Sequence, residues 1–74
     1  MWIDIEERPI PTYGKHGKEF LLSLKFKKYY GRDTRKTGDI VIGVWDSIDE
    51  CFFEKVTRLP IDDREIVQWA EIKN

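Results

Sequence analysis

Residues 18–46, KEFLLSLKFKKYYGRDTRKTGDIVIGVWD, decide the fold of this chain. The first part alternates apolar with polar side chains, which is the period of a strand with one buried and one solvated face. The apolar positions are Phe20, Leu22, Leu24 and Phe26, the polar ones are Glu19, Ser23, Lys25 and Lys27, and Leu21 is the exception. We therefore expect a two-faced strand here.

The second part, DIVIGVWD, is a short apolar run rich in β-branched residues, bounded by Gly38 and Asp46. Such a run predicts a strand that is covered on both faces. Between the two parts lies the polar segment YGRDTRKTG, which predicts a hairpin loop longer than the usual two to five residues. The centre of the chain is thus expected to be a hairpin with a charged tip.

The secondary structure of the N-terminal residues, and the regularity of the long strand, are less clearly predicted. Residues 2–6 predict a short edge strand, which Pro9 and Pro11 end, and a glycine-containing loop follows. At 13 residues, the apolar-alternating segment 18–30 is longer than common strands, so a bulge, a bend or a projecting arm is expected.

The last third supports two predictions. Ser47 with Glu50, and Asp62 with Glu65, have the spacing of a helix capping box, which predicts helices near 47–59 and 62–73. Against this, CFFEKVT and EIVQWAEI are dense in β-branched and aromatic residues and have the length of strands. The residues alone leave both predictions open.

Length and composition indicate one domain, residues 1–74, with an aromatic core. The chain is 14% aromatic and contains three tryptophans, which is high for its size. The single cysteine, Cys51, excludes an internal disulfide and suits a reducing compartment. There is no signal-peptide pattern and no apolar run of about 18 residues, so we expect a cytoplasmic protein without a membrane partner.

Charge is unevenly distributed although the chain as a whole carries only −1. The segment from Lys25 to Lys36 holds six basic residues and one acidic residue, whereas Asp39 to Asn74 holds nine acids and four bases. This pattern predicts a positive hairpin tip above a negative body, an arrangement that steers charged partners.

Four short segments, WIDIEERPIP, LLSLKF, VIGVWD and IVQWAEI, resemble a family of small phage and prophage proteins catalogued as domain of unknown function 551. The positions that match its opening and closing patterns are Trp2, Ile3, Ile5, Glu7, Arg8 and Pro11, then Val67, Gln68, Trp69 and Ile72. Gln68 and Ala70 depart from the usual His and Met, and the proline-rich tail of the family is missing. The resemblance implies a small β-rich fold, viral or prophage origin and no known catalysis.

With this resemblance, we expect an all-β fold: a small antiparallel meander or open barrel of four to five strands, curled around Trp2, Trp45 and Trp69. The alternative is an α+β fold with a helix near residues 47–59, near 62–73, or both. The three tryptophans could instead form an aromatic binding pocket, although a chain this small needs them in its core.

No residue pattern predicts catalysis. His16 is the one histidine, and no partner that would orient it as a base or metal ligand is identifiable, so it is expected on a loop surface. Cys51 follows Asp49 and Glu50, which would raise its pKa, so a structural thiol is expected. The acidic groups Asp46, Asp49 and Glu50, and Asp62, Asp63 and Glu65, lack the spacing of a calcium loop and suit turns.

The basic and aromatic tract KFKKYYGRDTRK is the strongest functional signal. We expect a non-enzymatic protein without cofactor or metal that engages a host or viral protein through this tract and the adjacent sheet edge, and inhibits a host function such as defence. The expected partner-binding residues are Lys25, Lys27, Lys28, Tyr29, Tyr30, Arg32, Arg35 and Lys36. The alternative ligand bears phosphate, either single-stranded nucleic acid or a small nucleotide. The oligomeric state stays open, a homodimer included.

Overall fold

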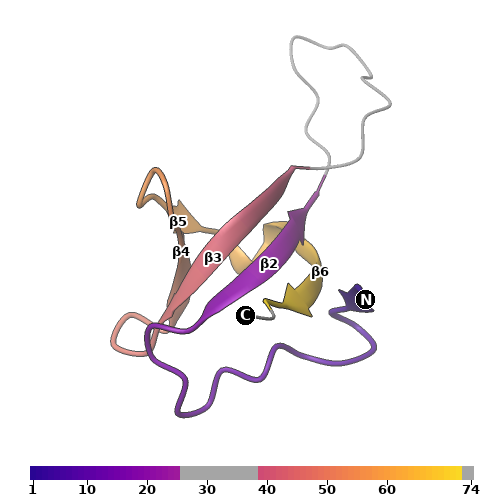
Figure 1. The fold of residues 1–74 in the computed structure, drawn as a ribbon, viewed down its shortest axis with the longest axis horizontal. Coiled ribbons are helices and arrows are strands. Elements are labelled where there is room, and N and C mark those ends of the chain that lie inside the picture. The colour runs from indigo at the N-terminus through magenta and orange to yellow at the C-terminus, as the bar shows by residue number, and fades with distance from the viewer. Residues whose placement is uncertain (26–38, 73–74) are drawn as a thin grey trace, which may run out of the picture.

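The computed structural model describes residues 1–25 and 39–72 of the chain (Figure 1). These residues form six β-strands and one short 3-10 helix, so the prediction of an all-β fold is confirmed, with six strands in place of four to five. The elements are β1 (Ile3–Asp4), β2 (Glu19–Leu24), β3 (Ile40–Asp46), β4 (Cys51–Glu54), β5 (Pro60–Ile61), η1 (Asp63–Glu65) and β6 (Ile66–Glu71).

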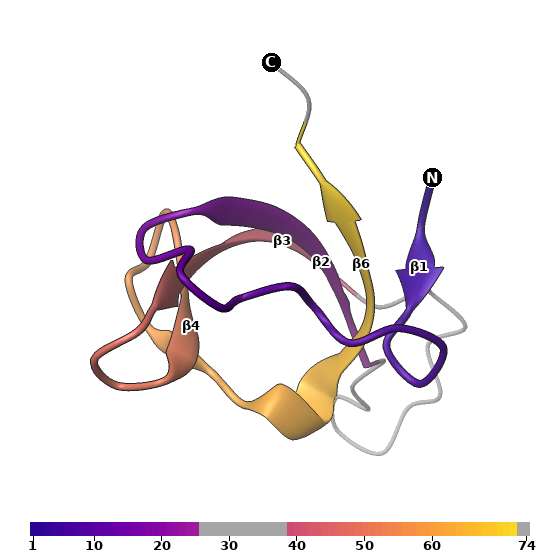
Figure 2. The same ribbon diagram turned by 90° about the horizontal axis from the view of Figure 1, so that it is seen from below.

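The six strands form one antiparallel sheet in the order β1-β6-β2-β3-β4-β5. Strands β2 to β5 follow one another as a meander, but β6 returns to lie between β1 and β2. Figure 2 shows that the sheet is strongly curved. The predicted hairpin therefore occupies the middle of the sheet, and β1 and β5 are its edges.

The buried core lies on the inner face of this curve and is built around Phe20 and Leu22, which are both 0% exposed. The ring of Phe20 packs edge-on against Phe52 and Trp69, with centroids 5.9 and 6.0 Å apart. Such contacts add about 0.5–1.5 kcal/mol each beyond the burial of area. The two-faced strand is confirmed up to Lys25, because Leu21, between Phe20 and Leu22, is only half-buried and Lys25 is exposed; Phe26 and Lys27 lie outside the described residues.

Strand β3 differs from the prediction that both its faces are covered. Among its residues only Gly43 is buried, and Ile40 is 60% exposed. A Cβ atom on Gly43 would lie 3.2 Å from Phe52 Cδ1 and closer still to the side chain of Leu22. The inner face of β3 is thus tightly packed, whereas Ile42 and Val44 on its outer face are only half-buried.

The predicted arrangement around three tryptophans is correct for two of them. Trp69 is 3% exposed, and Trp45 packs against the core with its ring 5.0 Å from that of Phe52. The prediction is wrong for Trp2, which is 37% exposed. Because Ile3 beside it packs against the core, alternation along an extended chain directs Trp2 to the outer face.

No α-helix forms within the described part of the last third, so the alternative helices near 47–59 and 62–73 are wrong. Residues 47–50 form a turn, in which the backbone N–H groups of Ile48 and Asp49 donate to Asp46 Oδ1 at 2.8 and 3.2 Å. The Asp62 cap does form, since its Oδ1 accepts from the N–H of Arg64 at 2.9 Å. It begins only the single turn of η1, after which the chain extends into β6.

Candidate functional site

The expected partner-binding tract lies mostly beyond the part of the chain that the structure describes. Lys25 is described; Lys27, Lys28, Tyr29, Tyr30, Arg32, Arg35 and Lys36 lie outside the described residues. The base of the hairpin is closed, because the N–H of Leu24 donates to the carbonyl of Asp39 at 2.9 Å. Lys25 is exposed directly after β2, so the tract begins at the middle of the sheet.

The expectation that this hairpin adjoins a sheet edge is wrong. Both of its strands are paired on both sides, β2 with β6 and β3, and β3 with β2 and β4. The true edges are two-residue strands. At β1 the carbonyl of Asp4 already accepts from the N–H groups of Glu7 and Arg8 at 3.0 Å, and β5 begins with Pro60, which has no N–H. Short, occupied edges of this kind resist the addition of another strand.

A more extensive surface is the outer face of the sheet. Strand pairing places Leu21 opposite Ile42, and Val44 opposite Phe53, on the side of the sheet away from the core. Ala70 of β6 pairs with Leu21, and Trp2 directly precedes β1, the strand on the other side of β6. We call this surface the outer apolar face and define it as Trp2, Leu21, Ile40, Ile42, Val44 and Phe53.

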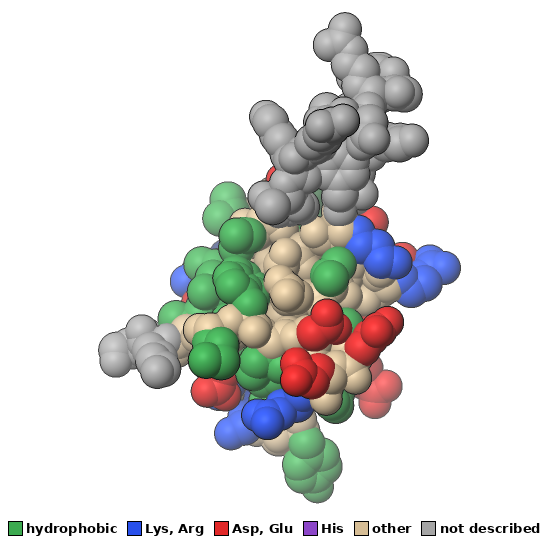
Figure 3. Space-filling model, turned by 90° about the vertical axis from the view of Figure 1, so that its right-hand side faces the viewer, with side chains coloured by type: hydrophobic (Ala, Val, Ile, Leu, Met, Phe, Trp, Pro, Cys, Tyr) green, Lys and Arg blue, Asp and Glu red, His purple; other side chains and the backbone are tan. Residues whose placement is uncertain are grey.

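One end of the outer apolar face is bordered by charge. The Nζ atom of Lys55 donates to Glu19 at 3.1 Å, and these two residues line a shallow hollow of about 360 Å³ together with Val44 and Phe53. An apolar centre with a charged rim is the usual anatomy of a protein interface. Figure 3 shows a face of the molecule on which hydrophobic and acidic side chains form separate groups.

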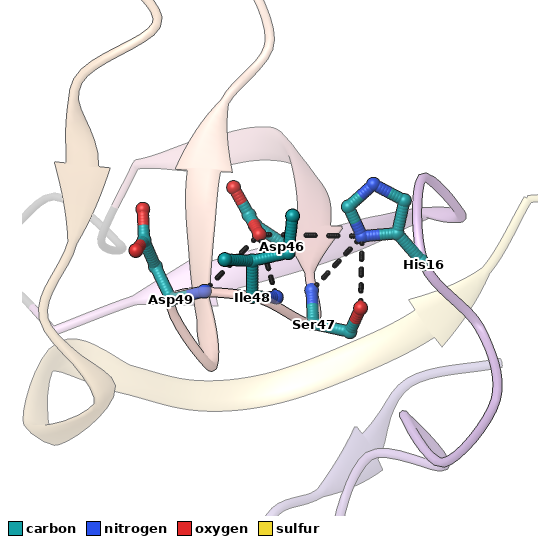
Figure 4. Close-up of polar contacts among 5 residues, drawn as sticks. All are labelled: His16, Asp46, Ser47, Ile48 and Asp49. Carbon is teal, nitrogen blue, oxygen red and sulfur yellow. Dashed lines mark hydrogen bonds and ion pairs between the residues drawn. The ribbon is translucent and has the colours of Figure 1, made fainter.

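His16 has the partner that the sequence did not identify. Its Nδ1 accepts the backbone N–H of Ser47 at 3.0 Å, lies 3.0 Å from Ser47 Oγ, and is 4.0 Å from Asp46 Oδ1 (Figure 4). Because an N–H can only donate, Nδ1 is the unprotonated nitrogen in this arrangement. The contact joins residues 31 positions apart, so no local pattern could have predicted it.

The Asp–His–Ser combination invites comparison with a catalytic triad, but the geometry is that of a clamp. In a triad the carboxylate and the hydroxyl lie on opposite nitrogens of the imidazole ring. Here Asp46 and Ser47 both approach Nδ1. Together with the bonds from Gly17 N to Trp45 O at 2.8 Å and from Trp45 N to Lys18 O at 3.0 Å, the contact fastens the loop before β2 to the turn after β3.

A hollow of about 550 Å³ lies beside this clamp. We call it the Tyr13–Trp45 hollow. It is lined by Thr12, Tyr13, Gly14, Trp45, Ser47 and Glu50. The sequence placed Trp45 in the core or in a pocket of three tryptophans and did not point to Tyr13, because Tyr13 and Trp45 come together only through the same clamp.

Cys51 is half-buried and has the surroundings of a structural thiol. Burial raises its pKa, and the charges of Asp49, Asp46 and Asp63 raise it further. The expected direction is therefore confirmed. A raised pKa keeps the sulfur as the thiol, which is a poor nucleophile.

The acidic turns are accounted for by backbone contacts. Asp46 caps the 47–50 turn, and Asp62 caps η1 while also pairing with the Arg64 guanidinium at 2.8 Å. Within residues 1–25 and 39–72, no group of three or more His, Cys, Asp or Glu side chains is arranged to hold a metal ion.

The three tryptophans do not form the alternative aromatic pocket. Trp69 faces the core, where its Nε1 donates to the carbonyl of Arg8 at 2.8 Å, whereas Trp2 lies on the outer face. Trp45 belongs to the Tyr13–Trp45 hollow.

Comparison with known proteins adds no assignment: no family model, curated protein or solved structure matches this chain. The resemblance to the phage family stays a prediction. Over the described residues, no helix has the length and apolar character needed to cross a membrane.

Proposed function

We propose that this chain is a small, non-enzymatic binding protein of phage or prophage origin that engages a protein of the host or virus. By covering part of its partner, it inhibits a host function, and defence systems are the targets we put first. The observation that carries the proposal is the outer apolar face.

The outer apolar face has the composition of an interface centre. It brings together an aromatic residue that is 37% exposed, Trp2, with the aliphatic side chains of two central strands. Aromatic residues are enriched, and charged residues depleted, at the centres of protein interfaces. The face also presents paired, rigid strands, so binding would require little ordering of this surface.

The basic tract supports the same proposal as a second contact region. It begins at Lys25, which leaves the sheet from β2, one of the strands that carry the outer apolar face. Its sequence charge of +5 would accelerate encounter with an acidic partner, while the apolar face would supply most of the affinity.

Two sets of substitutions test the two regions. The tagged protein is used to capture partners from host lysate, and each identified partner is then purified and titrated against the variants. We expect the double variant Leu21→Lys, Ile42→Lys to lower the affinity about tenfold or more, as loss of an interface centre does. The control is Asp63→Lys, which changes the net charge by the same amount at an exposed position of η1, outside the outer apolar face.

The second set changes Lys28, Arg32, Arg35 and Lys36 to Glu. We expect slower association that depends strongly on salt. If both sets bind the partner as the native protein does, the proposed surfaces are wrong. If no protein is captured by the native chain, the proposed function fails.

A second candidate function is the binding of a phosphate-bearing ligand, which the basic tract with Tyr29 and Tyr30 favours. Cations neutralise phosphates, and aromatic rings stack on bases. Titration with a single-stranded oligonucleotide or a cyclic dinucleotide distinguishes the two candidates, because phosphate contacts weaken log-linearly as salt rises. Absence of binding at low salt removes this candidate.

A further inference from the structure

Tyr13 is fully exposed, at 99%, yet it belongs to an ordered loop. The N–H of Lys15 donates to the carbonyl of Thr12 at 3.0 Å, and Gly14 and Gly17 adopt φ values of +69° and +81°, which favour glycine. The His16 clamp then fixes this loop against the turn after β3. A large aromatic side chain is thus presented to solvent on a held backbone, which is an arrangement suited to binding.

Trp45 provides the second aromatic surface of the Tyr13–Trp45 hollow. It packs against Phe52 of the core and also lines the hollow. Its backbone carbonyl and N–H bond to Gly17 and Lys18 on one side, and it pairs with Phe52 of β4 on the other, so its position is set by the sheet. The volume, about 550 Å³, falls in the range of sites that hold small ligands or single side chains.

The rim of the hollow is acidic. Glu50 lines it, and Asp49 precedes Glu50 in the same turn. Asp46 is engaged by the turn's own N–H groups, but among the described residues the carboxylates of Asp49 and Glu50 have no hydrogen bond or ion pair. The rim is therefore open to a positive ligand.

Neither lysine of the neighbouring loop lines the hollow. Lys18 pairs with Glu71 at 3.5 Å and lies 5.2 Å from the centre of the Phe20 ring, so it is engaged away from the hollow. Lys15 is the other basic residue of this loop. The described lining of the hollow thus combines two aromatic side chains with one charged group, the carboxylate of Glu50.

The aromatic side chains and the carboxylate of the hollow indicate which kind of ligand it can bind. Aromatic faces attract cations, most strongly at tryptophan, and a guanidinium can stack on a ring while donating to a carboxylate. An apolar ligand would leave Glu50 poorly solvated, and an anion would be repelled. We propose that the Tyr13–Trp45 hollow binds an arginine side chain carried by an extended, basic segment of a protein partner.

This inference rests on the proposed function in that the segment belongs to a protein, but it uses a different surface from the outer apolar face. Each proposal can therefore fail alone. The peptide titration below tests the hollow only, and the capture experiment with the Leu21 and Ile42 variant tests the outer face.

The probe is the synthetic peptide acetyl-Gly-Arg-Gly-Arg-Gly-amide, titrated into the full chain with ¹⁵N detection by NMR. We expect the indole N–H signal of Trp45 to shift with a dissociation constant on the order of millimolar, since cation–π contacts and exposed ion pairs are individually weak. The indole signals of Trp2 and Trp69 serve as internal controls and should not move. The matched peptide with citrulline in place of arginine keeps the shape, loses the charge, and should not bind.

Three variants assign the contacts. Glu50→Gln and Tyr13→Ala should each weaken binding about threefold to tenfold, because each removes one weak contact. Tyr13→Phe keeps the ring and should restore native affinity. Glu7→Gln, which removes an exposed acid on another loop, should bind as the native protein does.

Equal binding of the citrulline peptide, native affinity in Glu50→Gln, or no shift of the Trp45 signal at 10 mM peptide, about ten times the expected dissociation constant, would each overturn the proposal. Binding of an aspartate-containing peptide instead would also contradict it. Tyr13 is exposed and Glu50 lies in a surface turn, so these variants are expected to fold, and an unchanged spectrum away from the hollow checks this.

Discussion

Leu21 and Leu22 are the same residue type in adjacent positions of β2, and they have opposite surroundings. Leu22 is 0% exposed in the aromatic core, whereas Leu21 is half-buried on the outer apolar face. The inner face is closed by Phe20, Phe52 and Trp69, whereas Leu21 and its partner Ile42 on the outer face are only half-buried. The difference teaches that an apolar strand face can belong either to the core or to a surface available to a partner, and that only the packing decides between them.

The largest expected effect is a charge placed on the inner face. Leu22→Asp buries an unpaired carboxylate, which costs several kcal/mol, and a domain of this size has only about 3–5 kcal/mol of net stability. We therefore expect Leu22→Asp to unfold the protein, and Leu24→Asp, whose side chain also packs against the core, to do the same. Circular dichroism and thermal melts check both.

Substitutions at Leu21 and Lys25, which do not face the core, are the controls for this first prediction. Leu21→Asp should lower the melting temperature but leave a folded protein, and Lys25→Asp should be tolerated because Lys25 is exposed. As a quantitative pair, Leu22→Ala should cost about 2–5 kcal/mol, and Leu21→Ala clearly less. If Leu21 and Leu22 variants melted alike, the distinction between the two faces would be wrong.

The next effect concerns the two tryptophans on opposite faces. Trp69→Phe removes buried volume and leaves the carbonyl of Arg8 without its 2.8 Å hydrogen bond, which together should cost about 2–4 kcal/mol. Trp2→Phe should change the free energy of unfolding by less than about 0.5 kcal/mol, as exposed substitutions do. Urea unfolding measures both, and a larger loss from Trp2→Phe would place Trp2 in the core after all.

A smaller loss of stability is expected from a substitution at Gly43, where the inner face is tightly packed. Gly43→Ala introduces a Cβ that meets Leu22 and Phe52, and overpacking of this kind costs about 1–3 kcal/mol. The cost should shrink when Leu22→Val is present, because the shorter side chain makes room. Additive effects in this double-mutant cycle would show that the Gly43 site is not crowded by Leu22.

Much of the fold could be predicted from local pattern. The alternation from Phe20 to Leu24 predicted the inner face of β2, and the length of that segment predicted the irregularity now found where the β2–β6 register shifts between Ser23 and Leu24. The placement of β6 between β1 and β2 could not be predicted, since it depends on pairing between residues 42 to 66 positions apart. Asp62 shows the limit of a local signal: it caps one turn, and pairing with β2 then extends the chain.

The candidate surfaces were less predictable. Trp2 shares its alternation with Asp4 and Glu6, opposite to Ile3 and Ile5, so a signal for its outward position was present in the sequence. The pattern of β3 could not distinguish a covered face from an interface, because both are apolar. The Tyr13–Trp45 hollow depends on the contact of His16 with Ser47, which only the fold creates.

The smallest expected effect concerns Asp62, an exposed residue. Its contribution to the free energy of unfolding depends on pH, whereas the contribution of the apolar core does not. The Arg64 side chain, by hydrogen bonding, lowers the pKa of Asp62 below its ordinary value, and the Arg64 backbone N–H lowers it further. Because the folded pKa lies below the unfolded one, this contribution is fully present above the unfolded value and is lost as the pH falls through the folded value. Asp62→Asn should therefore be slightly less stable than the native protein at pH 7, and the difference should shrink under strongly acidic conditions. Urea unfolding at several pH values tests this, with Asp63→Asn as the control in the same turn, and a difference that grew on acidification would contradict the assignment.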